Sequence, residues 1–297
     1  MEEEYLAVLP EQVETRVLHG YLLGAVGPRP IAFASTVDGE GRPNLAPFSF
    51  FNVFSANPPV LIFSPARRVR DNTTKHTLEN VQQTGEVVVN VVSYPMVQQM
   101  SLASTEYDRG VNEFEKAGFT MVPSDRVAPY RVGEAPVQFE CRVTKVEPLG
   151  SEGGAGNLIH AEVLKIHIRR SVLDERDGID PRKLDLVARM GGDWYTRAAS
   201  GLFEVPKPLA SRGIGVDVIP GPIRLSPVLT GNDLGLLGNV EALPGREEVR
   251  LFVQAHGEVR ELLKQADSLE IHRHAQRLLE GNDVASAWKV LLASLEN

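Results

Sequence analysis

The stretch PIAFASTVDGEGRPNLAPFSFFNVFSANPPVLIFS, residues 30–64, decides the fold class of this 297-residue chain. Its first eight residues are typical of a strand, and the sequence DGEG that follows is typical of a tight turn. Residues 42–50 and 60–64 predict two further strands. The paired prolines in NVFSANPP predict a loop over residues 52–59, because proline cannot donate to a strand ladder. The stretch therefore predicts a β-meander.

The pattern of strands continues after a predicted helix from about Thr74 to Thr84, which Gly85 should end. Residues 86–92 are β-branched and strand-like. Two long strands follow at residues 135–149 and 157–168, joined by the glycine-rich loop GSEGGAG, and short helices are expected at YPMVQQMSLAS and VNEFEKAG. Many short strands with few helices between them favour a β-barrel or α+β fold over a doubly wound sheet.

The C-terminal third of the chain has a different character. Residues 200–240 are rich in glycine and proline, and the last fifty or so residues carry apolar side chains at helical spacing. These apolar stripes are interpreted as intramolecular packing, with a subunit contact as the alternative. Two regions are predicted: residues 1–200 as the β domain and residues 201–297 as a linker with a helical C-terminal extension.

Composition narrows the function classes. The net charge is −8 and the pI is near 5.5, so neither a nucleic acid nor an anionic membrane is an expected partner. The single cysteine, Cys141, is interpreted as a small buried strand residue. The absence of a signal-like segment and of a membrane-length apolar run predicts a cytoplasmic protein. The motifs HExxH and CxxC are absent, and His160 and His167 would lie on opposite faces of one strand. No metal site is therefore expected.

The stretch FSPARRVRDNTTKHTLENVQQTG, residues 63–85, concentrates positive charge in an acidic chain. A helix N-terminus offers free backbone N–H groups and the positive end of the helix dipole. Arg67 and Lys75 can add charge there, and Ser64 and Thr77 can add hydroxyl groups. This combination suits a phosphate monoester better than a lone carboxylate. The alternative is a solvated loop followed by a helix cap.

The segment APFSFFN, residues 46–52, adds a second signal. On a continuous strand, Phe48 and Phe50 would share one face, and Ser49 and Phe51 the other. Core packing explains part of this aromatic content. A strand that carries Ser49, Phe51 and Asn52 near a phosphate site would also suit a flat heteroaromatic ring with polar edges.

Taken together, these blocks resemble the flavin reductase-like family with the FMN-binding split barrel, and in particular its flavoredoxin-type branch. The resemblance covers roughly residues 20–198. It rests on residues 29–66, then on KHTLEN, TGEVVVNVV, GVNEFEKAGFT, FECRV, NLIHAEVLKIHI and LDLVARMGGDWY, in that order along the chain.

The resemblance implies a mainly β fold with helices, a Greek-key split β-barrel that forms a homodimer with FMN near the subunit interface. It places the flavin beside Ser35, Thr36, Pro47, Phe48, Ser49, Phe51 and Asn52. It places the FMN phosphate beside Ser64, Arg67, Lys75 and Thr77. One departure is His76, where the family pattern has aspartate, and the C-terminal extension is a second departure.

The implied reaction is transfer of hydride from NADH or NADPH to FMN, with electrons passed on to another acceptor, such as an acceptor protein or a partner monooxygenase. No side chain is required as an acid or base, so no catalytic residue is predicted. Three alternatives remain open. They are an electron-transfer protein of the flavoredoxin type, a non-catalytic FMN-binding protein whose helical tail engages a partner, and an empty structural barrel.

Overall fold

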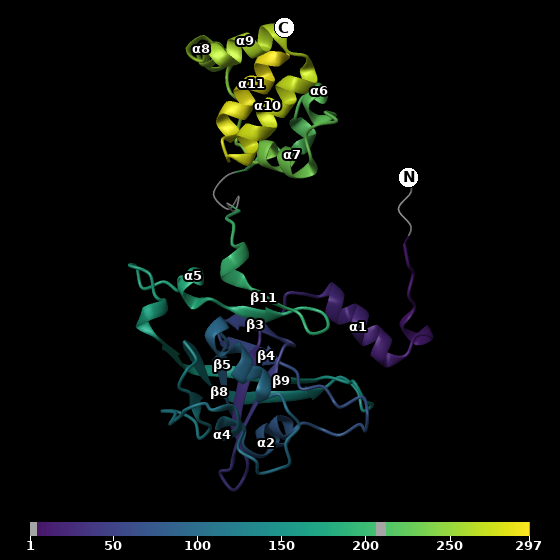
Figure 1. Cartoon of the computed structure of the whole chain (residues 1–297), viewed down its shortest axis with the longest axis vertical. Coiled ribbons are helices and arrows are strands. Elements are labelled where there is room, and N and C mark those ends of the chain that lie inside the picture. Colours follow the sequence, from purple (N-terminus) through teal and green to yellow (C-terminus); the bar gives the residue numbers. More distant parts are fainter. Residues whose placement is uncertain (1–4, 206–211, 297) are drawn as a thin grey trace. The chain divides into compact units, whose positions relative to one another are not determined.

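A computed structural model describes residues 5–205 and 212–296 of the chain (Figure 1). The chain divides into two compact units, residues 1–203 and residues 204–297. Among the described residues, every strand lies in the first unit, whereas the second unit is helical. Each unit contains its own buried apolar cluster, and each is described by itself below.

A seven-stranded antiparallel sheet forms the centre of the first unit, in the order β2-β1-β5-β8-β9-β4-β3. Its strands are β1 (Ala32–Val37), β2 (Pro43–Phe48), β3 (Phe51–Ala56), β4 (Pro59–Phe63), β5 (Glu86–Val91), β8 (Val137–Pro148) and β9 (Asn157–Ile168). The two edge strands, β2 and β3, are separated in sequence only by Ser49 and Phe50. Such a link spans about 11 Å at most, so the sheet must curl until its two edges lie close together. The predicted Greek-key split barrel is confirmed.

The interior of the barrel is filled by apolar side chains from the strands and from one helix, α2 (His76–Thr84). The strands contribute Ala32, Ala34, Phe48, Leu61, Phe63, Val87, Val89, Cys141, Ile159 and Ala161. α2 contributes Leu78 and Val81, and it ends at Gly85, whose φ of 69° lies in the left-handed region that glycine adopts most easily. Burial and the nearby Glu140 raise the pKa of Cys141 to about 12, as suits a structural thiol.

A second apolar cluster covers the opposite face of β1, with Phe33 and Leu45 facing Met100 and Phe114. It receives side chains from two short helices, α3 and α4. The remaining elements of the first unit are α1 (Thr15–Ala25), α3 (Val97–Leu102), α4 (Glu113–Ala117), α5 (Pro181–Leu184), β6 (Met121–Val122), β7 (Arg131–Val132), β10 (Val187–Arg189) and β11 (Tyr195–Arg197). Single 3-10 turns lie at Pro10–Gln12, Tyr94–Met96, Arg170–Val172, Ala198–Gly201 and Val216–Val218, the last of them in the second unit.

The loop predicted over residues 52–59 is wrong, because β3 occupies most of it. The chain turns at Asn57 and Pro58, and Pro59 is the first residue of β4. Proline is tolerated in a turn and at the first residue of a strand, so the pair punctuates a hairpin without breaking either strand. The predicted strand over residues 42–50 is also too long, since β2 ends at Phe48.

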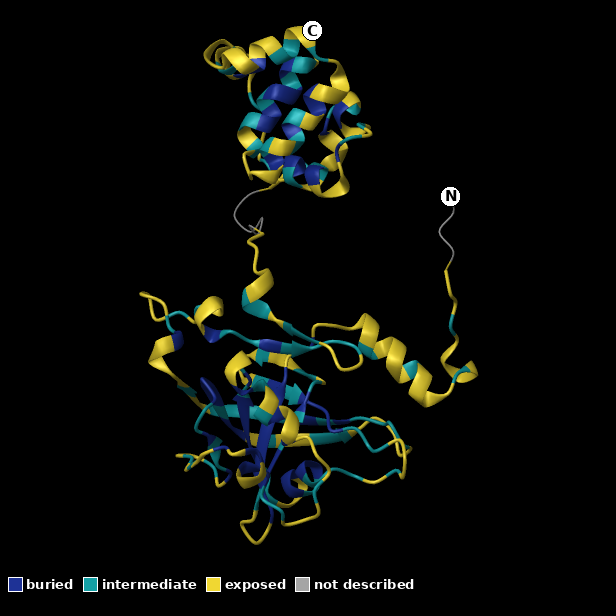
Figure 2. Cartoon of the chain, viewed as in Figure 1, coloured by how far each residue is buried: buried dark blue, intermediate teal, exposed yellow. Residues whose placement is uncertain are grey.

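The helix α1 was not predicted from the sequence. None of its eleven residues, all of them described, is buried. Its C-terminal end is held by Arg29, whose guanidinium donates to the carbonyl oxygens of Leu23 at 2.7 Å and of Met190 at 2.9 Å. α1 is therefore anchored at one end, while its own faces remain open to solvent (Figure 2).

The second unit is a helical bundle built around Trp288, which is 1% exposed and donates its indole N–H to the carbonyl of Leu237 at 3.0 Å. Its helices are α6 (Gly221–Arg224), α7 (Gly231–Gly238), α8 (Arg246–Ala255), α9 (Gly257–Gln265), α10 (Ser268–Glu280) and α11 (Val284–Ser294). The carboxylate of Asp267 caps α10 by accepting from the N–H of Glu270 at 2.8 Å. Within the described part of the chain, no helix combines the length and the apolar character that crossing a bilayer requires.

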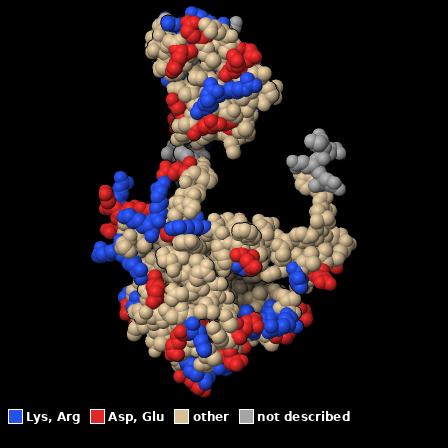
Figure 3. All heavy atoms as spheres, in the orientation of Figure 1, with Lys and Arg blue, Asp and Glu red and all other residues tan. Residues whose placement is uncertain are grey.

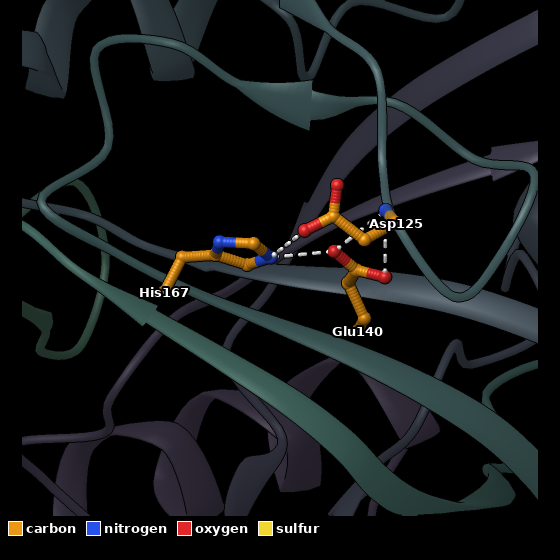
Figure 4. A group of neighbouring side chains, drawn as sticks. All are labelled: Asp125, Glu140 and His167. Carbon is orange, nitrogen blue, oxygen red and sulfur yellow. Dashed lines mark hydrogen bonds and ion pairs between the residues drawn. The ribbon is translucent and has the colours of Figure 1, made fainter.

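A charged cluster fastens the loop of residues 123–128 to the barrel (Figure 4). Glu140 on β8 is wholly buried, and its carboxylate accepts from the N–H groups of Asp125 at 3.0 Å and Arg126 at 2.5 Å. His167 on β9 lies with its Nε2 2.5 Å from the same carboxylate. Lys165 Nζ is 2.5 Å from Asp125 Oδ2 and Arg131 Nε is 3.9 Å from Glu140 Oε1, so each carboxylate of the cluster faces a cation.

Asp125, Glu140 and His167 are the one group of potential metal ligands found close together among the described residues. Their oxygen atoms already accept from backbone N–H groups, from the histidine and from Lys165. A cation would have to displace the Lys165 ammonium and those donors. The geometry therefore supports a loop clamp, and the prediction that the chain has no metal site stays a prediction.

Changing Glu140 to Gln should lower the free energy of unfolding near pH 7 by about 1.5–3 kcal/mol, the range for hydrogen bonds to a charged group. Burial alone would raise the pKa of Glu140, but the donors from Asp125, His167 and Arg126 outweigh burial and lower it. A lowered pKa stabilises the fold above the unfolded value, and this contribution is lost as the pH falls. Urea unfolding of the wild type and of Glu140→Gln, at neutral and at acid pH, measures the difference between their free energies of unfolding. This difference should be smaller at acid pH. An equal difference at both pH values would contradict this assignment.

Candidate functional site

A shallow pocket lies at the N-terminus of α2, where the sequence predicted an anion site. Its wall is formed by Asn44, Ala46, Arg68, Lys75, His76, Thr77, Ala103, Ser104, Thr105, Glu106, Tyr107 and Glu113. Lys75 is the N-cap residue of α2, and no described side chain caps this helix end. The N–H groups of His76 and Thr77 belong to the first turn, which has no intrahelical acceptors to offer them. The pocket thus combines a helix N-terminus with several side-chain donors.

The cations at this pocket share one carboxylate. Glu106 Oε1 accepts from Arg68 Nε at 2.9 Å and lies 3.5 Å from Lys75 Nζ, while its Oε2 accepts from Arg70 Nη2 at 2.9 Å. The hydrogen bonds from Arg68 and Arg70 lower the pKa of Glu106 to about 2. The carboxylate of Glu106 therefore balances the positive charge of these side chains, as an incoming anion would also do.

Beneath the pocket, a buried hydrogen-bond network joins α2 to the first two strands. The amide nitrogen of Asn44 donates to Thr77 Oγ1 at 2.9 Å and to Thr36 Oγ1 at 3.3 Å. Asn80 donates to the same Thr36 oxygen at 3.0 Å. Because both threonine hydroxyls act as acceptors here, each retains its own O–H group for a further acceptor. This network fixes the first turn of α2 against β1 and β2.

Ser64 and Arg67 lie away from this pocket, against the glycine-rich hairpin loop. Ser64 Oγ accepts from the N–H of Asn157 at 2.9 Å, and a Cβ atom at Gly156 would come within 2.7 Å of that oxygen. The guanidinium of Arg67 donates to Asn72 Oδ1 at 2.6 Å and to the Asn72 carbonyl at 2.7 Å. Arg68, which was not predicted as a site residue, lines the pocket, whereas Arg67 does not.

The predicted ring-binding residues spread along β2, the turn after it and β3. Phe48 is buried in the barrel, with its ring centroid 5.6 Å from that of Phe63, and Phe51 packs partly against the same core. Pro47 and Ser49 are half-buried, whereas Asn52 is exposed and its side chain accepts from the N–H of Val53. The expected alternation is interrupted at Ser49 because the chain turns there from one edge of the sheet to the other.

Ser35 lies on β1 opposite Leu45 of β2. Its hydroxyl is buried, and no hydrogen-bond partner is found for it among the described residues.

The N–H of Leu45 donates to Glu113 Oε2 at 3.0 Å, and burial raises the pKa of that glutamate. Glu113 therefore fixes the backbone of the edge strand beside the pocket, a role that the sequence analysis did not identify.

His76 lines the pocket at the position where the family pattern has aspartate. Burial, followed by the nearby charges of Arg109, Arg68 and Lys75, lowers the pKa of His76. The imidazole is therefore mainly neutral near pH 7, since the ordinary value is about 6.5. It offers the pocket a ring N–H donor without adding a third permanent charge.

Comparison with known proteins identifies the family to which the first unit belongs. Residues 25–184 match the family model described as "Flavin reductase like domain". A protein of Aquifex aeolicus described as uncharacterized is 40% identical over 188 residues, which are 63% of this chain and 93% of the relative. The structure is similar to that of nitrilotriacetate monooxygenase component B from Bacillus cereus, with a TM-score of 0.64 and 27% identity over 69% of this chain and 100% of the other.

A further solved structure, the 2-nitrobenzoate 2-nitroreductase of Pseudomonas fluorescens, is similar with a TM-score of 0.59 and 26% identity, over 70% of this chain and 100% of the other. The family match lies wholly within the first unit, which holds the split barrel and the pocket at α2. Family, fold and order of sequence blocks agree, and the chain belongs to the flavin reductase-like family.

Proposed function

We propose that this protein is a flavin oxidoreductase that binds FMN, takes hydride from NADH or NADPH and passes electrons to another acceptor. The observation that carries the proposal is the pocket at the N-terminus of α2, set in the barrel of a flavin reductase-like protein. It gathers two cationic side chains, hydroxyl groups and a helix N-terminus, the donors that a phosphate monoester requires. The residues present therefore fit the phosphate of FMN.

Each part of the flavin would meet a different part of the chain. Lys75, Arg68 and Thr77, with the N–H groups of the first turn of α2, would hold the phosphate. Asn44 and Ala46 of β2 also line the pocket, so β2 leads from the phosphate position toward the turn at Ser49. The backbone of residues 47–52 and the unpaired hydroxyl of Ser35 would face the ribityl chain and the ring. Ser64 and Arg67 would act indirectly, by shaping the loop that precedes α2.

The bound flavin supplies hydride acceptance and electron storage. The protein's own part is to orient the cofactor and to shield its face, and neither step needs an acid or base. Consequently we name no catalytic residue. A second candidate, electron transfer of the flavoredoxin type without NAD(P)H turnover, uses the same pocket and differs only in the source of electrons.

We also propose that two copies of the chain associate through the face that carries α1 and β3. An isolated helix of fewer than about 12–15 residues is marginal in water, and α1 has eleven residues with no buried side chain among them. Val53 and Phe54 on the edge strand β3 are 62% and 63% exposed. Apolar side chains on a free edge strand and an uncovered helix favour burial against a partner, here a second copy.

The reductase proposal predicts that the purified protein shows a flavin spectrum, after addition of FMN if necessary, and that anaerobic NADH or NADPH bleaches it within seconds. Absorption spectroscopy under argon measures both steps. A spectrum that stays unchanged with either nucleotide would instead support the electron-transfer alternative. No bound flavin at any FMN concentration would contradict the cofactor proposal itself.

For the phosphate site, Lys75→Ala and Arg68→Ala should each weaken FMN about tenfold or more, because a charge-assisted hydrogen bond contributes about 1.5–3 kcal/mol. Riboflavin, which lacks the phosphate, should bind the variants as it binds the wild type. Titration by flavin fluorescence quenching gives both affinities. Arg142→Ala is the control, since Arg142 is exposed on β8 and pairs with Glu162 outside the pocket.

A substitution of Glu106 should have the opposite effect on FMN affinity in the same titration. Glu106→Gln removes the negative charge that Arg68, Arg70 and Lys75 now share, so FMN should bind more tightly while riboflavin is unaffected. Equal losses for both flavins in the cation variants, or weaker FMN binding in Glu106→Gln, would mean that this cluster does not receive the phosphate.

The association proposal predicts a mass of twice the 32.6 kDa chain by light scattering after size-exclusion chromatography. Phe54→Asp and Leu22→Asp should shift that mass toward a single chain, because a carboxylate in an apolar interface is costly to desolvate. Leu251→Asp on α8 is the matched control, since Leu251 is 52% exposed, close to the 53% of Leu22. A wild-type protein that runs as a single chain would rule out this interface.

A further inference from the structure

The first unit contains a second, larger hollow that the flavin proposal does not use. It is a groove of about 540 Å³ that lies between the turn before α3, the loop before β8, the turn after β9 and α5. Its apolar floor is formed by buried side chains, namely Met96, Pro136, Val172 and Leu184. Its rim carries three exposed cations, Arg169, Arg182 and Lys183.

The residues that line the groove carry more positive than negative charge, with Arg169, Arg182 and Lys183 against Glu134 and Asp185. Figure 3 shows blue side chains, with red ones among them, over the region of α5 and the segment before it. No described group pairs with the guanidinium of Arg182. Arg169 donates to the carbonyl of Gly133 at 2.7 Å, and Lys183 donates to the carbonyl of Leu173 at 2.7 Å, so neither of these two meets a carboxylate.

The two carboxylates that line the groove, Asp185 and Glu134, are bonded elsewhere, and so are two neighbouring ones, Asp174 and Asp180. Asp180 accepts from the N–H groups at the start of α5, and Asp185 binds the guanidinium of Arg197 at 2.8 Å. Glu134 accepts from the N–H and the hydroxyl of Thr120, and Asp174 caps a turn through the N–H groups of residues 176 and 178. None of these carboxylates therefore forms an ion pair with Arg169, Arg182 or Lys183 in the described part of the chain.

We propose that this groove is a docking surface for an acidic segment of a partner protein, in which an apolar side chain reaches the floor and carboxylates meet Arg182 and Lys183. Charge complementarity of this kind steers a partner toward the surface and selects its orientation. Packing against the apolar floor then removes the partner's apolar side chain from water, which is favourable in proportion to the apolar area buried.

A protein segment suits the groove better than a small anion does. Sites for small ligands place buried polar groups that converge on the ligand, whereas here the cations stand on the exposed rim and the buried floor is apolar. The groove is also distinct from the flavin pocket, because Met96 and Gln99 line the groove while Ala103 and Ser104, at the other end of α3, line the pocket. Partner and flavin can therefore be bound at the same time.

The test uses a short fluorescein-labelled peptide of aspartate and glutamate around a central Leu-Phe pair, and the same peptide with every carboxylate replaced by its amide. Fluorescence anisotropy with the full-length protein should show binding of the acidic peptide only. That binding should weaken as the ionic strength rises. The double variant Arg182→Gln/Lys183→Gln should weaken the acidic peptide about fivefold or more, in line with two exposed ion pairs.

The matched control is Arg260→Gln/Arg273→Gln, which removes two exposed arginines from α9 and α10 in the second unit and should leave the affinity unchanged. FMN should bind the groove variant as it binds the wild type, so failure of the flavin proposal would not be mistaken for failure of this one. Equal binding of both peptides, an equal loss in both double variants, or displacement of the peptide by millimolar inorganic phosphate at constant ionic strength would each overturn the proposal.

Discussion

The link of two residues between β2 and β3 is the constraint on which the rest of the first unit depends. These strands are the opposite edges of a seven-stranded sheet, so Ser49 and Phe50 can join them only if the sheet closes on itself. Closure creates the barrel interior that Phe48, Phe63 and the apolar face of α2 fill. It also directs the N-terminus of α2 toward β2, where Asn44 bonds Thr77 and builds the floor of the pocket.

The electrostatics of the pocket follow from that placement. A helix N-terminus, Lys75 and Arg68 would leave an uncompensated positive site, and Glu106 supplies the missing negative charge. An anion that enters must compete with this carboxylate or rearrange it. A phosphate group has two advantages in that competition: a higher charge near neutral pH, and oxygen atoms enough for both the backbone N–H groups and the cations. Glu106 thereby keeps Arg68 and Lys75 in position for a phosphate group, which would be bound by the same two side chains.

Much of the fold could be predicted because its signals are local. The turn DGEG, the β-branched run before Asn90, and Gly85 at the end of α2 each set a boundary by their own chemistry. The errors lie where a tertiary constraint prevailed. Pro58 and Pro59 indicated a loop, but they occupy a hairpin turn and a strand start, where a missing N–H costs little. α1 was not predicted, although Val17, Leu18, Tyr21 and Leu22 recur at helical spacing, and none of these apolar side chains is buried in the fold.

The candidate site could be predicted only in part, for a similar reason. Lys75 and Thr77 lie on the helix that forms the pocket, so proximity in sequence located them. Arg67 and Arg68 are neighbours with identical side chains, and only the fold shows that Asn72 holds one while the other lines the pocket. Glu106 and Glu113 come from a segment some thirty residues further along the chain, which no spacing rule connects to α2.

The most direct measurement of the central claim is a crystal structure of the protein with bound FMN. We predict that the phosphate lies within hydrogen-bond distance of the N–H groups of His76 and Thr77, with Lys75 turned from Glu106 toward it and the ring along the turn at Ser49. A phosphate located elsewhere on the barrel, with Glu106 still bonded to Arg68 and Lys75, would contradict the account.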